Sequence, residues 1–435
     1  MDWKKHTYRA GSHSDARDDL PDGEELDKFV ARARKGIEPW LSAVFQAEHL
    51  NLLVGSGLTI AVGHMAGASA TGMSKVTFGT AHDPAIDAHA DAAAAVMKRG
   101  GANIEDQFRS ALAVIGGLEV TDPAGADALK NAVDAQLTLF LKSLLETERG
   151  IVAATDAEAR QSALSALQSF LLSFASRAAS RERLHIFTTN YDRLIEHGCD
   201  LAGLRSIDRF VGALNPVFRA SRVEVDVHYN PPGIRGEPRY MEGVVRLTKL
   251  HGSLDWCFDK SARQIVRKGI PFGALDGHSE MPVRPIDTVM IYPNPAKDVE
   301  TTQYPYAELF RDFAAAVCRP NAVVVAYGYG FGDDHVNRVL LDMLTIPSTH
   351  MVIIAHSASD RVKAFCANVR DAQVTLLIGP HFGDLSALVE HYLPKPALDY
   401  ITGRMTELLK RRPFDGAPGA ADGGGVPPAS PVDPF

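Results

Sequence analysis

Short apolar runs that end at glycine or polar residues are the strongest pattern along the chain. They lie at residues 51–55, 184–189, 244–250, 288–293, 322–328, 351–356 and 374–379. Continuous apolar runs of this length are typical of central strands in a parallel sheet. Helical patterns at 190–200, 306–318 and 335–344 alternate with them. The sequence therefore predicts an α/β fold with a doubly wound, mostly parallel Rossmann-like sheet.

The pattern changes between Asp83 and Arg183, where Ala, Leu, Glu and Lys dominate and apolar residues recur at helical spacing. We therefore expect one main domain over 29–414 that carries a large helical insertion at about 83–183. Residues 1–28 are polar, which predicts a flexible N-terminal segment. Residues 415–435 are rich in Gly and Pro, which predicts a disordered tail.

Charge and cysteine content narrow the class of protein. The chain has 45 Lys and Arg against 53 Asp and Glu, a net charge of −8, which disfavours direct binding to nucleic-acid phosphates. Its four cysteines form no CxxC pair, so neither a metal site nor a disulfide framework is expected. We find no apolar segment of signal-peptide or membrane-spanning length and expect a cytoplasmic protein without a membrane partner.

A glycine turn follows the first predicted strand and is a candidate phosphate-binding loop. It comprises Gly55, Ser56, Gly57, Leu58 and Thr59. Glycines at such a turn let backbone N–H groups approach a pyrophosphate closely. Ile60 stands where the dehydrogenase motif GxGxxG would need its third glycine, so that motif is not met. The glycines are equally compatible with turn geometry alone.

Polar residues also follow later predicted strands. Thr188, Thr189, Asn190, Tyr191 and Asp192 come at the end of one, where open α/β sheets place ligands. Asn190 or Asp192 is alternatively only a helix cap.

His251 follows the next predicted strand and is the best general-base candidate, since an imidazole titrates near neutral pH. A structural histidine is the alternative. Gly328, Tyr329 and Gly330 lie in a second glycine turn, which predicts another nucleotide contact. Asp333 and Asp334, just after it, are more typical of helix capping than of catalysis.

Together, in this order, the four segments resemble the catalytic core of the sirtuins, in the divergent Sir2-type branch of NAD hydrolases found in bacterial anti-phage defence systems. GSGLT resembles the family's Gly-Ala-Gly-Ile-Ser loop, TTNYD its Thr-Gln-Asn-Ile-Asp segment, and KLHG the strand with its histidine-glycine pair. GYGFGDDHVNRVL resembles its later glycine turn and helix. The resemblance covers roughly residues 48–380, interrupted by the helical region.

The resemblance implies NAD as substrate and roles for individual residues. Asn190, His251 and Asp192 would be catalytic. The residues implied in NAD binding are Gly55, Ser56, Gly57, Thr59, Thr189, Gly328, Tyr329, Gly330 and His356. The four-cysteine zinc module of sirtuin deacylases is absent, so no metal is expected, and water becomes the favoured acceptor.

The resemblance thus predicts an NAD glycohydrolase that depletes NAD as an anti-phage effector. It also implies a homo-oligomer and a separately encoded HerA-like DNA-translocating ATPase as partner. Three alternatives stay open: a non-catalytic sensor of NAD or ADP-ribose, an NAD-dependent deacylase or ADP-ribosyltransferase, and a dehydrogenase, which the missing GxGxxG motif disfavours.

Overall fold

The computed structural model describes residues 3–69, 73–96, 101–177, 180–222, 226–229, 239–259, 261–281, 285, 288–290 and 304–395. The predicted tail at 415–435 lies outside these residues.

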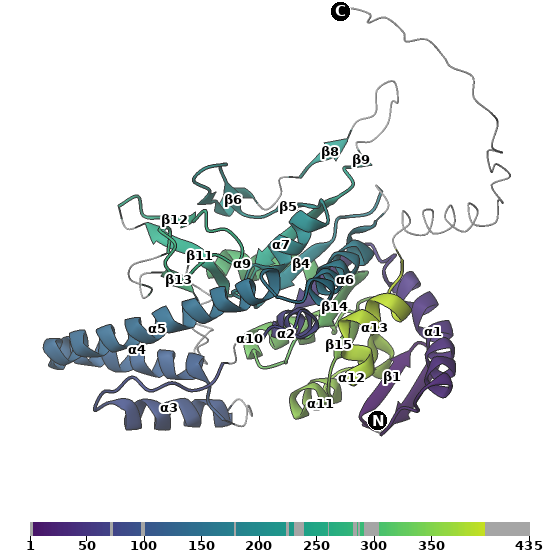
Figure 1. Cartoon of the computed structure of the whole chain (residues 1–435), viewed down its shortest axis with the longest axis horizontal. Helices are drawn as coiled ribbons and strands as arrows, with labels where there is room; N and C mark the ends of the chain where they lie inside the picture. Colours follow the sequence, from purple (N-terminus) through teal and green to yellow (C-terminus); the bar gives the residue numbers. More distant parts are fainter. Residues whose placement is uncertain are drawn as a thin grey trace, which may run out of the picture. The chain divides into compact units, whose positions relative to one another are not determined.

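A nine-stranded sheet forms the centre of the described chain (Figure 1). Seven of its strands run parallel. In spatial order they are β16 (Val374–Ile378), β15 (His350–Ala355), β14 (Ala322–Tyr327), β3 (His49–Val54), β4 (His185–Thr188), β10 (Val244–Lys249) and β5 (Arg205–Ile207). The predicted Rossmann-like α/β fold is confirmed.

Helices cover both faces of this sheet, and alternate strand residues pack against each layer. Leu52 and Val325 contact a core formed with α1 (Glu24–Val44), α2 (Ser56–Met65), α6 (Ala157–Ala175), α7 (Leu194–Leu201), α12 (Pro380–Gly383), α13 (Leu385–Ala387) and η4 (Leu388–Tyr392). Leu53 and Val324 contact the opposite core, formed with α9 (Tyr306–Val317), α10 (Asp334–Met343) and α11 (Asp360–Ala367). Burial on both faces explains why these strands are continuous apolar runs.

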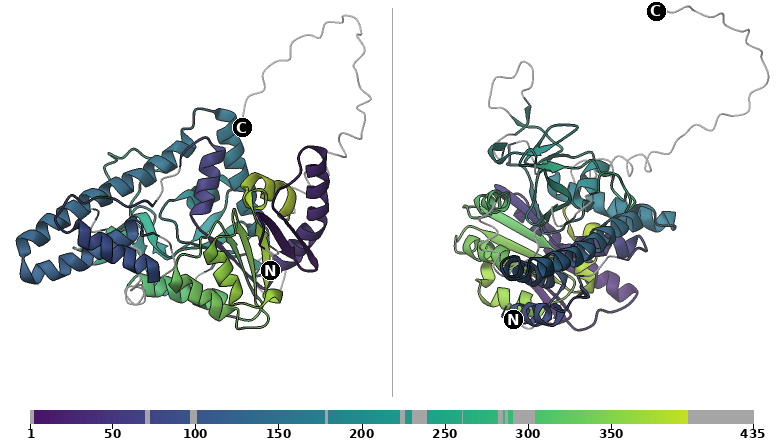
Figure 2. Two further views of the ribbon diagram at one scale, coloured as in Figure 1. Left: turned by 90° about the horizontal axis from the view of Figure 1, so that it is seen from below. Right: turned by 90° about the vertical axis from the view of Figure 1, so that its left-hand side faces the viewer.

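The helical insertion is smaller than predicted. Helices α3 (Asp83–Val96), α4 (Ile104–Thr121) and α5 (Pro123–Val152) lie side by side (Figures 1 and 2). They share a core that is separate from those of the main sheet and that also includes Tyr191, Leu254 and Ile270. Helix α6 instead packs on the main sheet through Leu167 and Phe170. Helical periodicity alone did not tell these two environments apart. None of the helices in the described ranges is both long and apolar enough to cross a membrane.

A second, antiparallel sheet has five strands. It consists of β13 (Thr288–Met290), β11 (Gly252–Asp259), β12 (Gln264–Arg267), β7 (Val217–Phe218) and β6 (Phe210–Val211). The prediction of a central parallel strand at 288–293 is therefore wrong for 288–290, which pair antiparallel with β11, and 291–293 lie outside the described residues. A short two-stranded ribbon, β8 (His228–Tyr229) and β9 (Arg239–Tyr240), completes the strands described.

The N-terminal segment is ordered, which corrects the prediction of a flexible region at 1–28. Strands β1 (His6–Ala10) and β2 (His13–Arg17) form a hairpin that pairs antiparallel with β16, and α1 begins at Glu24. Tyr8 is buried with its ring 5.5 Å from that of Phe382. A strand at the sheet edge needs few apolar positions, so its polar average composition concealed it.

The order of the strands reverses between β3 and β14, and the turns after these two strands are in direct backbone contact. Gly55 N donates to Tyr327 O (3.1 Å) and Gly57 N donates to Gly328 O (3.0 Å). A Cβ atom on Gly57 would lie 2.5 Å from Gly328 Cα, and Gly328 has a φ of +60°. Such a reversal is where doubly wound sheets open a ligand crevice.

This contact predicts that Gly57→Ala destabilises the protein. The added methyl group meets backbone rather than a movable side chain, so we expect a loss of about 1–3 kcal/mol in the free energy of unfolding. Gly116→Ala is the matched control, because it lies in helix α4 with open space around it and should stabilise by up to about 1 kcal/mol. Denaturant unfolding measures the free energy of unfolding of both variants. Equal values for Gly57→Ala and Gly116→Ala would contradict the close contact at Gly57.

Candidate functional site

A cavity of about 370 Å³ lies at the carboxyl ends of β3, β4, β10 and β14, above the glycine contact. Its volume is in the range of small-molecule sites. The residues along it are Gly55, Ser56, Thr59, Ile60, Met73, Asn103, Glu105, Leu144, Thr147, Thr189, Asn190, Tyr191, Asp192, His251, Tyr329, Gly330, Gly332, Asp333 and Arg361. Because Glu105, Leu144 and Thr147 come from α4 and α5, the insertion forms one wall.

Most of the predicted site residues meet at this cavity. Those along it are Gly55, Ser56, Thr59, Thr189, Asn190, Asp192, His251, Tyr329 and Gly330, whereas Gly57 and Gly328 form the contact beneath.

His356 is the exception. It is exposed just after β15, and its backbone packs against Gly383, so it is not among the residues along the cavity. The prediction that it binds the nucleotide is not supported, because β15 is separated from β3 by β14 and its turn faces α12 instead.

Asn190 is held by its amide nitrogen. Nδ2 donates to Gly55 O (3.1 Å) and to Thr59 Oγ1 (3.2 Å). A carbonyl only accepts hydrogen bonds, so the contact with Gly55 fixes which side of the amide is nitrogen. Both N–H bonds are thereby used, and the amide oxygen keeps its capacity to accept from a ligand or water at the cavity.

Asp192 is a support for this asparagine and bonds the start of α7. Its Oδ2 accepts from Thr59 Oγ1 (2.8 Å) and its Oδ1 accepts from the N–H of Leu194, the first residue of α7 (3.1 Å). Asp192 therefore bonds the first N–H of α7 as well as Thr59, next to the N-cap residue Arg193. Although it lies along the cavity, its carboxylate acts on Asn190 through Thr59, and we treat it as a positioning residue.

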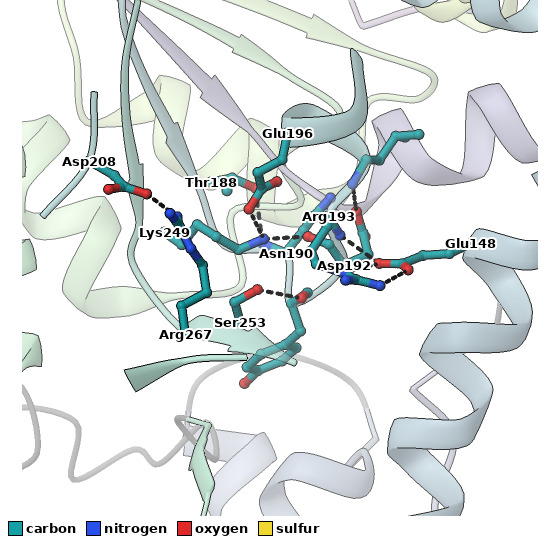
Figure 3. A network of polar contacts seen from close by, with 12 residues as sticks. Glu148, Thr188, Asn190, Asp192, Arg193, Glu196, Asp208, Lys249, Ser253 and Arg267 are labelled. Atoms are coloured by element: carbon teal, nitrogen blue, oxygen red, sulfur yellow. Dashed lines mark hydrogen bonds and ion pairs between the residues drawn. The ribbon is translucent and has the colours of Figure 1, made fainter. Parts of the chain in front are cut away.

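The loop that carries Asn190 is fixed from two further sides (Figure 3). Lys249, with a side chain 3% exposed, donates to Asp192 O and to the Glu196 carboxylate (3.0 Å). Arg193 forms a bidentate ion pair with Glu148 of α5, through Nε to Oε1 (3.1 Å) and Nη2 to Oε2 (2.5 Å). The Arg193 N–H also donates to Glu148 Oε1 (2.9 Å).

The Arg193–Glu148 pair is nearly inaccessible to water, with side chains 6% and 1% exposed. Burial raises the pKa of the Glu148 carboxyl group, while the hydrogen bonds and the charge of Arg193 act in the opposite direction. Arg193 also donates to Ile270 O and Pro271 O, and Gly273 N donates to Glu148. One ion pair thus joins α5, the loop after β4 and the segment around 270–273.

His251 faces a second histidine that the sequence analysis did not select. His251 lies two residues after the end of β10 and is 3% exposed. Its Nε2 atom lies 3.1 Å from the Nε2 atom of His335. His335 belongs to α10 and is 6% exposed. The ring of His335 is 4.8 Å from that of Phe310. Asp333 has a ligand atom within 4.8 Å of both imidazoles. Only its position directly after the second glycine turn could have drawn attention to His335.

The cysteines offer no nucleophile for this site. Burial raises the pKa of Cys199 to about 12 and those of Cys257, Cys318 and Cys366 to about 11. Thiols with such pKa values are almost entirely protonated at neutral pH. A cysteine thiolate is therefore not available for chemistry at the cavity.

The chain has a Rossmann-like α/β fold with a cavity at the strand-order reversal, which is where such folds bind ligands. Residues 184–375 match the family model of the SIR2-like domain. The match includes Asn190, His251 and His335 and supports a Sir2-family, NAD-related role. It begins after the glycine turn at 55–57 and after α3–α5. No curated protein matches the chain in sequence.

Thr59→Val tests whether the hydroxyl group between Asn190 and Asp192 positions the site. Valine keeps the shape but donates nothing to the buried carboxylate, so we expect a loss of about 1–3 kcal/mol in unfolding free energy. Thr59→Ser keeps the hydroxyl and should retain most of the stability. Similar denaturant midpoints for the two variants would contradict the network.

The buried pair is tested by a double-mutant cycle of Glu148→Leu and Arg193→Met. Each single change strands a buried charge and should cost about 3–5 kcal/mol. The double variant should lose clearly less than the sum of the two, because neither charge remains unpaired. Additive losses, measured by urea unfolding, would show that the two side chains are energetically independent.

Proposed function

We propose that the chain is an NAD glycohydrolase that cleaves the bond between nicotinamide and ribose and releases ADP-ribose. The observation that carries the proposal is the meeting of Asn190 and His251 at one cavity of nucleotide size, within a SIR2-like domain. Gly55, Gly57 and Gly328 donate their N–H groups within the protein. A pyrophosphate would instead be held by the backbone of Ser56, Tyr329 and Gly330, which lie along the cavity in the same two turns.

The reaction transfers ribose from nicotinamide to water. As the C1′–N bond breaks, its electron pair moves to the nicotinamide ring, which leaves as a neutral molecule, and positive charge develops on the ribose. The Asn190 amide oxygen would orient the attacking water. His251 would accept the proton that this water loses. This is general-base catalysis, for which imidazole is the most common group.

Water is favoured over an acyl-lysine acceptor. A deacylase of sirtuin type uses a four-cysteine zinc module after its histidine motif, and this chain has four cysteines in all, two of them far from that region. The antiparallel strands β11, β12 and β13 follow His251 instead. A sensor would bind NAD without releasing nicotinamide, and a dehydrogenase would transfer hydride.

The proposal extends to an anti-phage effector that stays idle until it is activated. Control by homo-oligomerisation and by a HerA-like DNA-translocating ATPase would supply such a switch. Exposed apolar side chains on the insertion favour an interaction surface there: Val96 and Val120 are 84% exposed and Leu139 is 56% exposed.

The decisive experiment measures nicotinamide and ADP-ribose release from NAD, with and without co-expressed genomic neighbours. Asn190→Ala and His251→Ala should each lower the rate by about 100-fold or more, since each removes a group from the transition state. Asn131→Ala and His64→Ala are matched controls, because these exposed side chains lie away from the cavity, and they should keep the wild-type rate.

Two outcomes would reject the hydrolase. Wild-type protein that binds NAD but never releases nicotinamide would favour the sensor. Release that occurs only with an acyl-lysine peptide would favour the deacylase.

A further inference from the structure

Three metal-ligating side chains converge at one end of the cavity. His251 comes from the turn between β10 and β11, and Asp333 and His335 come from the start of α10. Their ligand atoms all lie within 4.8 Å of one another. Leu250, next to His251, and Val336, next to His335, belong to the same buried core. The side chains are therefore brought together by tertiary structure rather than by local sequence.

The spacing and the types of these groups suit a transition metal. Zn–N bonds of about 2.0–2.1 Å in a tetrahedral site place two imidazole nitrogens about 3.3 Å apart. The Nε2 atoms of His251 and His335 are 3.1 Å apart and face each other. Two imidazoles and one carboxylate favour Zn²⁺ or Co²⁺ over Mg²⁺ and Ca²⁺, which take mainly oxygen ligands.

The surroundings favour such a site as well. Both histidines are almost fully buried, next to the rings of Tyr191 and Phe310. His251 and Asp333 both lie along the cavity, so the fourth position of a tetrahedral metal would face it. Three protein ligands with one open position are typical of zinc sites that contact a substrate or water.

We propose that His251, Asp333 and His335 bind a divalent transition metal, with Zn²⁺ as the fitting ion, and that the bound metal blocks the site. A metal takes the Nε2 lone pairs of both imidazoles and displaces the proton held between them. His251 then has no lone pair left at Nε2 to accept a proton from water. The blocking effect rests on the proposed NAD hydrolysis, whereas metal binding does not.

Metal binding is measured first, without NAD, on full-length protein freed of any affinity tag and treated with a chelator. Titration with Co²⁺ should give the visible absorption bands of a tetrahedral complex at one ion per chain, and Zn²⁺ should abolish them. His335→Ala and Asp333→Asn should lose the bands, while His64→Ala should keep them. Circular dichroism and thermal melts establish that each variant is folded; His335→Asn replaces His335→Ala if the latter is not.

Wild-type protein without tetrahedral bands, or folded His335 and Asp333 variants that keep them, would overturn the site.

The second measurement is NAD hydrolysis with and without Zn²⁺. Zn²⁺ should lower the wild-type rate by about 100-fold, the loss expected for His251→Ala, and a chelator should restore it. For His335→Ala, the ratio of the hydrolysis rate without Zn²⁺ to the rate with Zn²⁺ should be much smaller than for the wild type. Zn²⁺ that leaves the wild-type rate unchanged or raises it would overturn the blocking effect.

Tetrahedral Co²⁺ bands in a protein that never hydrolyses NAD would support the metal site and reject the hydrolase.

Discussion

The close backbone contact between the turns after β3 and β14 is the constraint on which the site depends. Because Gly57 and Gly328 have no side chains, α2 begins directly against the turn after β14. This places Thr59, in the first turn of α2, where it bonds both Asn190 and Asp192. A side chain at Gly57 would push the two turns apart and would move the residue that orients the asparagine.

The insertion provides the second constraint, through a pair of charges that is costly to bury. Removing a carboxylate and a guanidinium from water costs several kcal/mol each, and their attraction compensates only in good geometry with further hydrogen bonds. Glu148 and Arg193 meet that condition, because they form a bidentate pair and Arg193 also bonds the carbonyls of Ile270 and Pro271. Helix α5 is thereby fixed to the residue that follows Asp192, and the insertion becomes part of the site.

The sequence predicted six of the seven parallel strands and nine of the nineteen residues along the cavity, for one physical reason. Central parallel strands are buried on both faces, so they appear as apolar runs, and polar or glycine residues at their ends lie at the carboxyl edge. The edge hairpin at 6–17 lacks that signal because it needs few apolar positions. Residues 288–290 show that an apolar run does not reveal which sheet it joins.

Contacts between distant elements were not predictable from one sequence. Glu148 and Arg193 are 45 positions apart and His251 and His335 are 84 apart, and nothing in their local patterns links them. These two contacts fix different halves of the site. Asn190 lies in a loop held by α2, α5 and Lys249, whereas His251 is paired with α10. A displacement of α10 against the sheet would therefore change the environment of His251 while Asn190 stays in place. The relative position of the two side chains thus depends on the packing between α10 and the strands.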